Sequence, residues 1–387
     1  MKQKRHQQRP VIFLAGSGSG GPVTPLLALV PFLHRALPVV QCVLVGSGGV
    51  EERLAKGADV PYVQIVAAKL RRYWSWTNVL APFQCVIGFV QSYFLLGKEH
   101  VACVVGAGGF VQVPLVWAAW LRGVPIVIHQ QDVIPGLANR LCAPFADKIT
   151  VSLERSQNDF PAGWMLRHLN KREGDRVVWT GNPVRDLEVP SRVKAHQQLR
   201  IDSKFPTILI MGGGTGSRAL NDIVLQALPL LERFANVIHL TGGREVIAYQ
   251  EGPHYRRFAF LDDMGCAYGA ADVVVSRAGM GAITELAHIG KPAIIIPMPN
   301  SHQEYNADVL NEKEAALAVT QEVLTAEGLS GLIRGLLFEH RLQQRLVKNL
   351  QAVLPVHATK SVATIIVRLI QSSAGNIGAL AGQGRYK

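Results

Sequence analysis

Residues 11–21 read VIFLAGSGSGG, a short apolar run that passes directly into a loop made only of glycine and serine. The apolar run predicts a buried strand, and the residues after the loop predict a helix. Because glycine has no Cβ, the N–H groups of such a loop can approach a ligand closely. The helix behind it adds partial positive charge at its N-terminus, where phosphate is the usual ligand. The stretch therefore predicts a Rossmann-like strand–loop–helix unit.

Two familiar phosphate-binding motifs fit this loop poorly. No lysine follows it, which disfavours a P-loop. Gly16, Gly18 and Gly21 nearly spell the dinucleotide fingerprint, but Gln41 and Cys42 stand where an acidic ribose ligand belongs, so an NAD-dependent oxidoreductase is disfavoured. A flexible turn that binds nothing is the remaining alternative.

Short β-branched runs alternate with longer segments of helical period throughout the chain, which indicates parallel sheets covered on both faces. We expect strands at residues 11–14, 43–45, 103–105, 126–128, 208–211, 237–240, 273–275 and 293–296. A second glycine-rich loop, MGGGTGSRALN at 211–221, precedes an apolar helical stripe that Pro229 should kink. The pattern therefore occurs twice and predicts two Rossmann-like domains that face each other across a cleft.

The breaker-rich passage after Gly181 divides the chain. We expect an N-terminal domain over residues 1–184, a linker over 185–206 and a C-terminal domain over 207–357. A helix over 358–371 is expected to pack back on the N-terminal domain, and a tail over 372–387 to be disordered.

Composition favours an anionic partner in a reducing compartment. The chain has 387 residues, a formal net charge of +12 and a pI of about 9.7. Such a charge suits phosphate-bearing substrates, nucleic acid or anionic lipid, and does not choose among them. Its five cysteines lie far apart and form no metal-binding motif, which fits the cytoplasm.

Residues 73–97 carry no charge over 25 positions, which is long enough to cross a bilayer. Pro82, Asn78 and other polar residues interrupt the segment, so we expect it to dock on a membrane surface instead. The stretch before it mixes cations with aromatic side chains, which suits either nucleic-acid stacking or a membrane interface. Its residues are Lys69, Arg71, Arg72, Tyr73, Trp74 and Trp76.

The second half contains ADVVVSRAG at 271–279, TEL at 284–286, GKP at 290–292 and HQEYNA at 302–307. Together with VGAGGF at 105–110, HQQD at 129–132 and GNPVR at 181–185, these strings closely resemble the MurG family of inverting GT-B glycosyltransferases. The resemblance covers roughly residues 10–370. It implies transfer of N-acetylglucosamine from UDP-GlcNAc to the undecaprenyl-linked acceptor lipid I, in peptidoglycan synthesis, at the cytoplasmic face of the cell membrane.

The resemblance also implies roles for individual residues. Glu285 would accept hydrogen bonds from the ribose hydroxyls, Gln303 would bind the sugar, and Arg185 would pair with the diphosphate. Leu261 would meet the uracil through its backbone. The remaining donor contacts would be Ser19, Gly20, Gly21, Asp132, Gly214, Met280, Gly281, Ala282, Ile283 and Thr284. The cationic and aromatic residues at 69–76 would lie at the acceptor site and the membrane, which favours lipid over nucleic acid as the partner.

The sequence departs from the family pattern where a general base is needed to deprotonate the acceptor's 4-hydroxyl. Pro22 occupies the place of the histidine that usually ends the first glycine loop, and proline cannot take a proton. The usual H-E-Q-N reads H-Q-Q-D here, and Gly214 stands where serine is common. We therefore expect Asp132 or His129 to act as the base, with Asp132 favoured because its charge is new at this position.

Two further expectations concern the reaction. Asp262 and Asp263 do not have the spacing of a metal-binding D-x-D motif, and helix N-termini with basic side chains can stabilise a leaving diphosphate, so we expect no obligatory metal or cofactor. The alternatives are a GT-B transferase that acts on another lipid such as diacylglycerol, and a catalytically impaired protein that only binds UDP-sugar or lipid.

Overall fold

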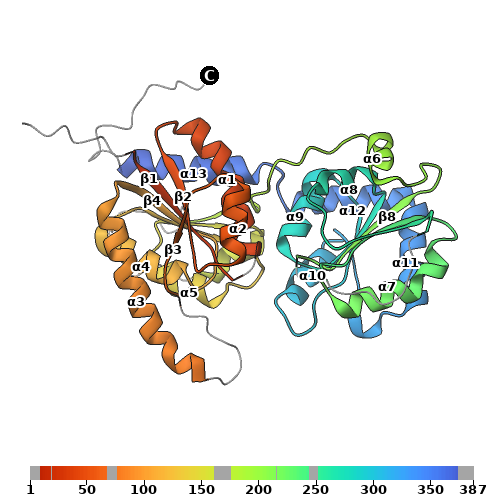
Figure 1. Ribbon diagram of the computed structural model, residues 1–387, viewed down its shortest axis with the longest axis horizontal. Coiled ribbons are helices and arrows are strands. Elements are labelled where there is room, and N and C mark those ends of the chain that lie inside the picture. The colour runs from red at the N-terminus through yellow and green to blue at the C-terminus, as the bar shows by residue number, and fades with distance from the viewer. Residues whose placement is uncertain are drawn as a thin grey trace, which may run out of the picture. The chain divides into compact units, whose positions relative to one another are not determined.

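The computed structural model describes residues 9–18, 20–67, 76–160, 176–214, 216–243 and 252–373, with only the backbone described for 76–79. The chain divides into two compact units (Figure 1). The first comprises Met1–Arg185 together with His357–Lys387, and the second comprises Asp186–Val356. Each unit is an α/β fold built on one parallel sheet.

The sheet of the first unit has the order β3-β2-β1-β4-β5-β6-β7, and every neighbouring pair is parallel. Its strands are β1 (Val11–Ala15), β2 (Gln41–Gly46), β3 (Tyr62–Gln64), β4 (Val101–Gly106), β5 (Ile126–Gln130), β6 (Lys148–Val151) and β7 (Val177–Trp179). The strand order reverses between β1 and β4. Ligands of open parallel sheets bind at such a reversal, beyond the carboxyl ends of the strands.

Helices cover both faces of this sheet and bury two apolar cores. They are α1 (Gly20–Ala36), α2 (Val50–Gly57), α3 (Trp76–Lys98), α4 (Gln112–Arg122), α5 (Leu137–Cys142) and α13 (Ala358–Ser373), with short 3₁₀ turns η1 (Ala143–Phe145) and η2 (Glu154–Asp159). The last helix, α13, lies beside α1 and buries Val362, Ile366 and Ile370 in the core under β1 and β4 (Figure 1). The helix expected at 358–371 thus extends to Ser373, and the rest of the expected tail lies outside the described residues.

The sheet of the second unit has the order β10-β9-β8-β11-β12-β13 and reverses between β8 and β11. Its strands are β8 (Thr207–Met211), β9 (Asn236–Leu240), β10 (Tyr255–Phe258), β11 (Val273–Ser276), β12 (Ala293–Ile295) and β13 (Leu317–Ala318). Its helices are α6 (Arg192–Leu199), α7 (Arg218–Leu231), α8 (Met264–Ala270), α9 (Met280–Ile289), α10 (Gln303–Glu312), α11 (Ala326–Phe338) and α12 (His340–Val353), with a 3₁₀ turn η4 (Gln321–Val323).

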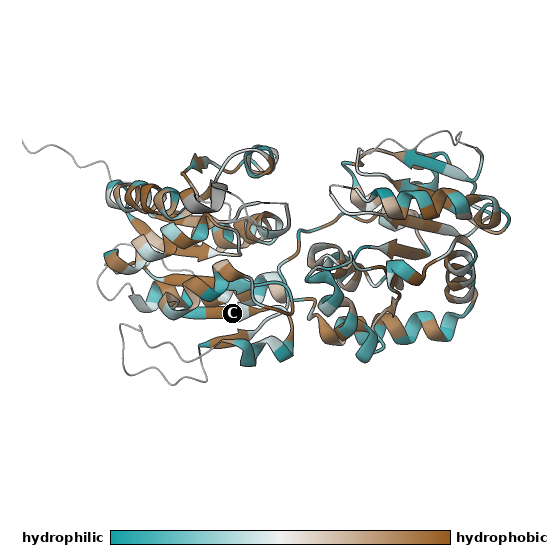
Figure 2. Cartoon of the chain, turned by 90° about the horizontal axis from the view of Figure 1, so that it is seen from below, coloured by the Kyte–Doolittle hydropathy of each residue, from teal (hydrophilic) through white to brown (hydrophobic). Residues whose placement is uncertain are grey.

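All eight strands expected from the sequence are present, and the strands of both sheets are predominantly apolar (Figure 2). Five short strands were not expected. They are β3, β6, β7, β10 and β13, and several carry charged or polar residues, such as Arg256 and Arg257 in β10. Helix α6 forms within the expected linker, and helix α7 continues past Pro229 and ends at Leu231.

Candidate functional site

Three loops of the first unit meet at the strand reversal, each following the carboxyl end of a strand. The Val111 N–H of the loop after β4 donates to Ser17 Oγ of the first glycine loop, at 3.3 Å. A Cβ on Gly109, whose φ is +83°, would lie 2.4 Å from the Ser17 carbonyl oxygen, so only glycine permits this contact. The loop after β5 joins them, because Gln131 Nε2 donates to the Ala107 carbonyl at 3.2 Å. The three loops therefore form one surface.

A buried carboxylate fixes the first glycine loop. Glu51, in the first turn of α2, is 3% exposed, and its Oε1 accepts a hydrogen bond from the Gly18 N–H at 2.8 Å. Ser47 Oγ lies 3.4 Å from the same oxygen. The Gly18 N–H is therefore bonded within the protein. Sequence analysis missed Glu51, because it lies 33 positions after Gly18 and no motif marks it.

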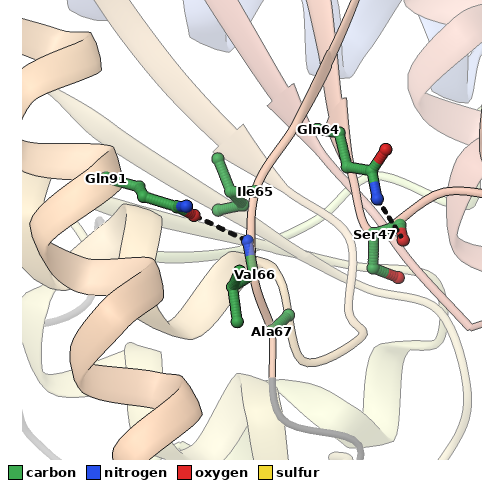
Figure 3. Close-up of a pocket in the computed structure, with 6 residues that line it drawn as sticks. All are labelled: Ser47, Gln64, Ile65, Val66, Ala67 and Gln91. Carbon is green, nitrogen blue, oxygen red and sulfur yellow. Dashed lines mark hydrogen bonds between the residues drawn. The ribbon is translucent and has the colours of Figure 1, made fainter.

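A pocket of about 490 Å³ is lined in part by Ser47, the residue whose hydroxyl contacts this carboxylate (Figure 3). It is lined by Ser47, by Gln64 at the end of β3, by residues 65–67 that follow this strand, and by Gln91 of α3. Gln91 Oε1 accepts from the Val66 N–H at 2.8 Å, and Gln64 Nε2 donates to the Ser47 carbonyl at 3.2 Å (Figure 3). The pocket thus presents amide and hydroxyl groups beside short apolar side chains.

His129 lies on β5 inside the first unit and is 1% exposed. Its Nε2 lies 2.8 Å from Asn182 Oδ1 and its Nδ1 lies 2.9 Å from Thr150 Oγ1. Since an amide oxygen can only accept, Nε2 carries the proton and Nδ1 accepts from the threonine hydroxyl. Burial lowers the pKa of His129 to about 4. With both nitrogens bonded and the ring buried, this geometry favours a structural role and does not support His129 as the general base.

Asp132 stands in the loop after β5 and is half-buried. Its neighbour Gln130 is 3% exposed and donates through Nε2 to the Asp132 carbonyl at 2.7 Å. Of the two acid–base candidates, only Asp132 has a partly exposed side chain at the carboxyl edge of the sheet.

The buried histidines predict a loss of stability in mild acid. Burial lowers the pKa of His129 and of His239, each to about 4, whereas an unfolded histidine titrates near 6.5. The unfolded chain therefore binds more protons below about pH 6.5, and the stability that the neutral rings contribute is lost as the pH falls from 6.5 toward 4. We expect each ring to cost on the order of 1–2 kcal/mol at pH 5, measured by urea unfolding between pH 5 and 7.5.

A His239→Gln variant checks this assignment. It should flatten the dependence of unfolding free energy on pH, because an amide does not titrate. An unchanged slope would assign the acid sensitivity to other groups.

In the second unit, a buried arginine joins the glycine loop to the end of β12. Arg277 is 6% exposed and donates through Nη1 to the carbonyls of Ile296 and Pro297, at 3.3 and 2.9 Å. Its Nη2 donates to Ser217 Oγ, which also caps the N-terminus of α7. Gly214 is exposed within this loop, which follows β8.

Helix α9 begins shortly after β11, and residues 280–285, which are expected donor contacts, form its first turns. Glu285 Oε2 accepts a hydrogen bond from the hydroxyl of Tyr268 on α8, at 2.8 Å. Gln303 begins α10. Its side chain lies beside Gly279 at the start of α9, since a Cβ added to Gly279 would be 3.9 Å from Gln303 Nε2. The second unit therefore brings Met280 to Glu285 and Gln303 together at the carboxyl edge of its sheet.

The other predicted residues fall in several places. Leu261 is half-buried in the turn before α8, and Asp263 caps that helix, since its Oδ1 accepts from the Cys266 N–H at 3.0 Å. Gly20 and Gly21 begin α1, and Arg185 is exposed after β7. Ser19, Lys69, Arg71, Arg72, Tyr73 and Trp74, and the side chain of Trp76, lie outside the described residues. Within the described ranges, no cluster of three or more His, Cys, Asp or Glu side chains could hold a metal ion.

Helix α3 carries an exposed apolar stripe. Phe83, Ile87 and Val90 are 68%, 49% and 45% exposed, and Leu80 and Phe94 extend the same face at helical spacing. The opposite face of α3 packs on α4, and on α3 the side chain of Ser92 is fully buried. Two described segments are long and apolar enough to span a bilayer, Leu80–Lys98 and His340–Ser373. The share of the apolar window that is buried inside the protein is 22% in the first and 44% in the second. Because α3 is held against α4 along one face, it is a surface helix of this unit (Figure 1).

Comparison with known proteins matches both units to one family. Residues 12–151 match the glycosyltransferase family 28 N-terminal domain, and residues 207–365 match its C-terminal domain. The chain is 34% identical over 357 residues to the UDP-N-acetylglucosamine–N-acetylmuramyl-(pentapeptide) pyrophosphoryl-undecaprenol N-acetylglucosamine transferase of Geobacillus thermodenitrificans, covering 89% of this chain and 94% of the relative. The enzyme of the same name from Legionella pneumophila strain Paris is 31% identical over 365 residues, covering 92% and 96%.

Solved structures agree with this assignment. The crystal structure of Acinetobacter baumannii MurG superposes with a TM-score of 0.70 at 28% identity, covering 93% of this chain and 99% of that one. The calicheamicin glycosyltransferase CalG4 shares the fold alone, with a TM-score of 0.66 at 13% identity, covering 96% of this chain and 100% of that one. From two matched domains and relatives above 30% identity over most of the length, the chain belongs to the MurG family within glycosyltransferase family 28.

Proposed function

We propose that this protein is the inverting glycosyltransferase that moves N-acetylglucosamine from UDP-GlcNAc to the 4-hydroxyl of MurNAc in undecaprenyl-pyrophosphoryl-MurNAc-pentapeptide. The observation that carries the proposal is the position of Gln303 beside Gly279, the residue that precedes α9, with Glu285 on the same helix. Helix α9 follows β11, at the strand reversal of the second sheet. The names of the relatives from Geobacillus and Legionella support the same donor and acceptor.

The second unit suits the donor. We assign the diphosphate to the first turn of α9, whose N-terminal N–H groups and partial positive charge favour an anion and stabilise it further as it leaves. Glu285 is assigned to the ribose hydroxyls, with Tyr268 holding its carboxylate in place. Arg185, Gly214, Leu261, Ser19, Gly20 and Gly21 remain predicted donor contacts.

The first unit suits the acceptor. We assign to Asp132 the proton of the acceptor's 4-hydroxyl as that oxygen bonds to the anomeric carbon and the bond from this carbon to UDP breaks. The pocket that Ser47, Gln64 and Gln91 line together with residues 65–67 is a suitable place for the amide and hydroxyl groups of the acceptor. Neither assignment requires a metal ion.

The apolar stripe of α3 suits a membrane surface. Its exposed side chains from Leu80 to Phe94 follow one face of the helix, and the cations at 69–72 precede it in sequence. Apolar groups bury into the boundary of headgroups and acyl chains, and cations attract anionic lipid. We therefore place the protein at the cytoplasmic membrane face, as a peripheral protein that meets its lipid-linked acceptor there.

Replacing Glu285 by alanine should raise the KM for UDP-GlcNAc by about 10- to 100-fold, because hydrogen bonds to a charged group contribute about 1.5–3 kcal/mol. The KM for the acceptor should stay within about twofold. Initial rates at varied donor concentration measure the effect.

Two variants accompany this measurement. Tyr268→Phe removes only the hydroxyl that orients Glu285 and should have a smaller effect of the same kind. Glu312→Ala, an exposed acid at the end of α10, should leave the donor KM unchanged. An unchanged donor KM in Glu285→Ala would refute the ribose assignment.

The test of function uses the purified full-length protein with UDP-GlcNAc and an undecaprenyl-diphosphate MurNAc-pentapeptide analogue, in the presence of EDTA. We expect acceptor-dependent UDP release with a disaccharide-lipid product. Release only with diacylglycerol would assign another lipid acceptor. UDP-GlcNAc binding without release to either acceptor would indicate an impaired enzyme, for which Pro22 is the first suspect.

A further inference from the structure

A chain of buried amides connects two loops of the candidate site. Gln112 on α4, Asn139 on α5 and Gln130 on β5 are each less than 5% exposed. The Gly108 N–H donates to Gln112 Oε1 at 2.8 Å, and Gln112 Nε2 donates to Asn139 Oδ1 at 2.5 Å. Asn139 Nδ2 then donates to Gln130 Oε1, also at 2.5 Å. The chain thus runs from the glycine loop after β4 to the end of β5.

Gln130 ends this chain and holds the loop that follows. Its Nε2 donates to the carbonyl of Asp132 at 2.7 Å and to that of Ile134 at 3.1 Å. With Oε1 accepting from Asn139, both polar atoms of the amide are bonded. Turning the amide over would set Oε1 against two carbonyl oxygens and Nε2 against the Asn139 amino group, so one orientation alone satisfies the contacts. One side chain, that of Gln130, therefore bonds the loop backbone at both residue 132 and residue 134.

In this chain, a carboxylate at position 130 would lose the two hydrogen bonds that the amide donates to the loop. The family pattern has a carboxylate at position 130 and an amide at 132, whereas this chain has an amide, Gln130, and a carboxylate, Asp132. An ionised carboxylate only accepts hydrogen bonds, so at position 130 it would face two carbonyl oxygens without a donor. It would also place a second negative charge two residues from Asp132. Gln130 therefore donates hydrogen bonds to the loop and leaves Asp132 as its one negative charge, whereas glutamate at position 130 would do neither.

We propose that Gln130 is a positioning residue, which fixes the loop over residues 131–136 and leaves Asp132 as the sole negative charge of that loop. The inference rests on the proposed role of Asp132 as general base. It gives a physical reason why the two departures suit each other: an amide at position 130 donates to the loop carbonyls without adding a second charge beside the carboxylate at position 132.

Several other charged groups lie near this loop, and substitution of Gln130 leaves all of them in place. Arg140 of α5 donates through Nε to the Pro135 carbonyl at 3.0 Å. The turn η2, whose Ser156 hydroxyl donates to the Val133 carbonyl, also carries charged side chains. These are Glu154, Arg155 and Asp159. His129 precedes Gln130 on β5 and is neutral at pH 7, because burial lowers its pKa to about 4.

The test compares Gln130→Glu with Gln130→Met, using Gln41→Glu at an exposed amide of β2 as the control for added charge. Both variants at position 130 should lower kcat about tenfold or more, because a small displacement of the catalytic group Asp132 slows the reaction strongly. The KM for UDP-GlcNAc should stay within about threefold of the wild-type value. Only Gln130→Glu should move the acidic limb of the kcat–pH profile to higher pH, since a nearby negative charge raises the pKa of a carboxyl base. Gln41→Glu should change neither.

Hydrogen exchange of the amides at 131–134 and 136 gives a readout that does not depend on activity. Both variants at position 130 should exchange faster there than the wild type, with no change in the second unit. Wild-type exchange and a wild-type pH profile in Gln130→Glu would overturn the proposal. If Asp132→Asn is fully active, the role of Asp132 as base fails by itself, and the exchange rates alone decide whether Gln130 positions the loop.

Discussion

Asp132→Asn is expected to lower kcat for transfer by about 100-fold or more, which is the usual contribution of a positioned general base. The asparagine side chain has nearly the same size but cannot accept the proton of the acceptor hydroxyl. The structure leaves Asp132 as the candidate because its side chain is half-buried just after β5, whereas His129 is 1% exposed with both ring nitrogens bonded. Single-turnover rates with a soluble acceptor analogue measure the effect.

Donor binding separates loss of the base from loss of the site. If Asp132 acts mainly on the proton, calorimetric binding of UDP-GlcNAc should change little, and the residual rate should lose its acidic limb. A large loss of donor affinity with an unchanged maximal rate would assign Asp132 to the donor instead. Asp159→Asn, at an exposed acid of η2, is the matched control and should retain full activity.

The double variant Phe83→Ser/Phe94→Ser is expected to weaken partition onto anionic vesicles by at least about 100-fold. Both rings are exposed on α3, at 68% and 61%, and burying a phenylalanine side chain contributes about 1.5–3 kcal/mol. Their combined loss is therefore about 3–6 kcal/mol, if both enter the lipid. Sedimentation with vesicles that contain phosphatidylglycerol measures the partition.

Activity on a soluble acceptor analogue should remain within about twofold in this variant, because both rings lie on the exposed face of α3 and belong to none of the loops after β1, β4 and β5. The control Val323→Ser/Phe338→Ser removes two similarly exposed apolar side chains from the second unit, where they are 73% and 59% exposed. Equal loss of vesicle binding in both double variants would show that α3 is not the membrane-binding surface.

The strands that hold the glycine loops were predictable because β-branched runs are buried on both faces of a parallel sheet. The short strands were not predictable from the sequence, since β10 carries Arg256 and Arg257 and β13 has only two residues. Such strands form because a neighbouring strand supplies the hydrogen bonds, which is a property of the assembled sheet.

The candidate site follows the same division. Glu285 and Gln303 could be named as candidates from the sequence, because each lies in a motif within one stretch of chain. Glu51 could not, since its bond to Gly18 joins two segments with no shared pattern. Likewise, the sequence showed that Gln130 and Asp132 depart from the family pattern, but only the hydrogen bonds of the Gln130 amide connect the two departures.

Helix α13 gives the first unit a particular order of completion during synthesis. The strands of that unit end at Trp179, but the surface that they and α1 leave for Val362, Ile366 and Ile370 stays uncovered until the ribosome has added the whole second unit. At translation rates of about 5–20 residues per second, that interval is roughly 10–40 seconds. The second unit, which is continuous in sequence, can finish folding first, and the apolar surface of the nascent first unit stays exposed to water until its last helix arrives.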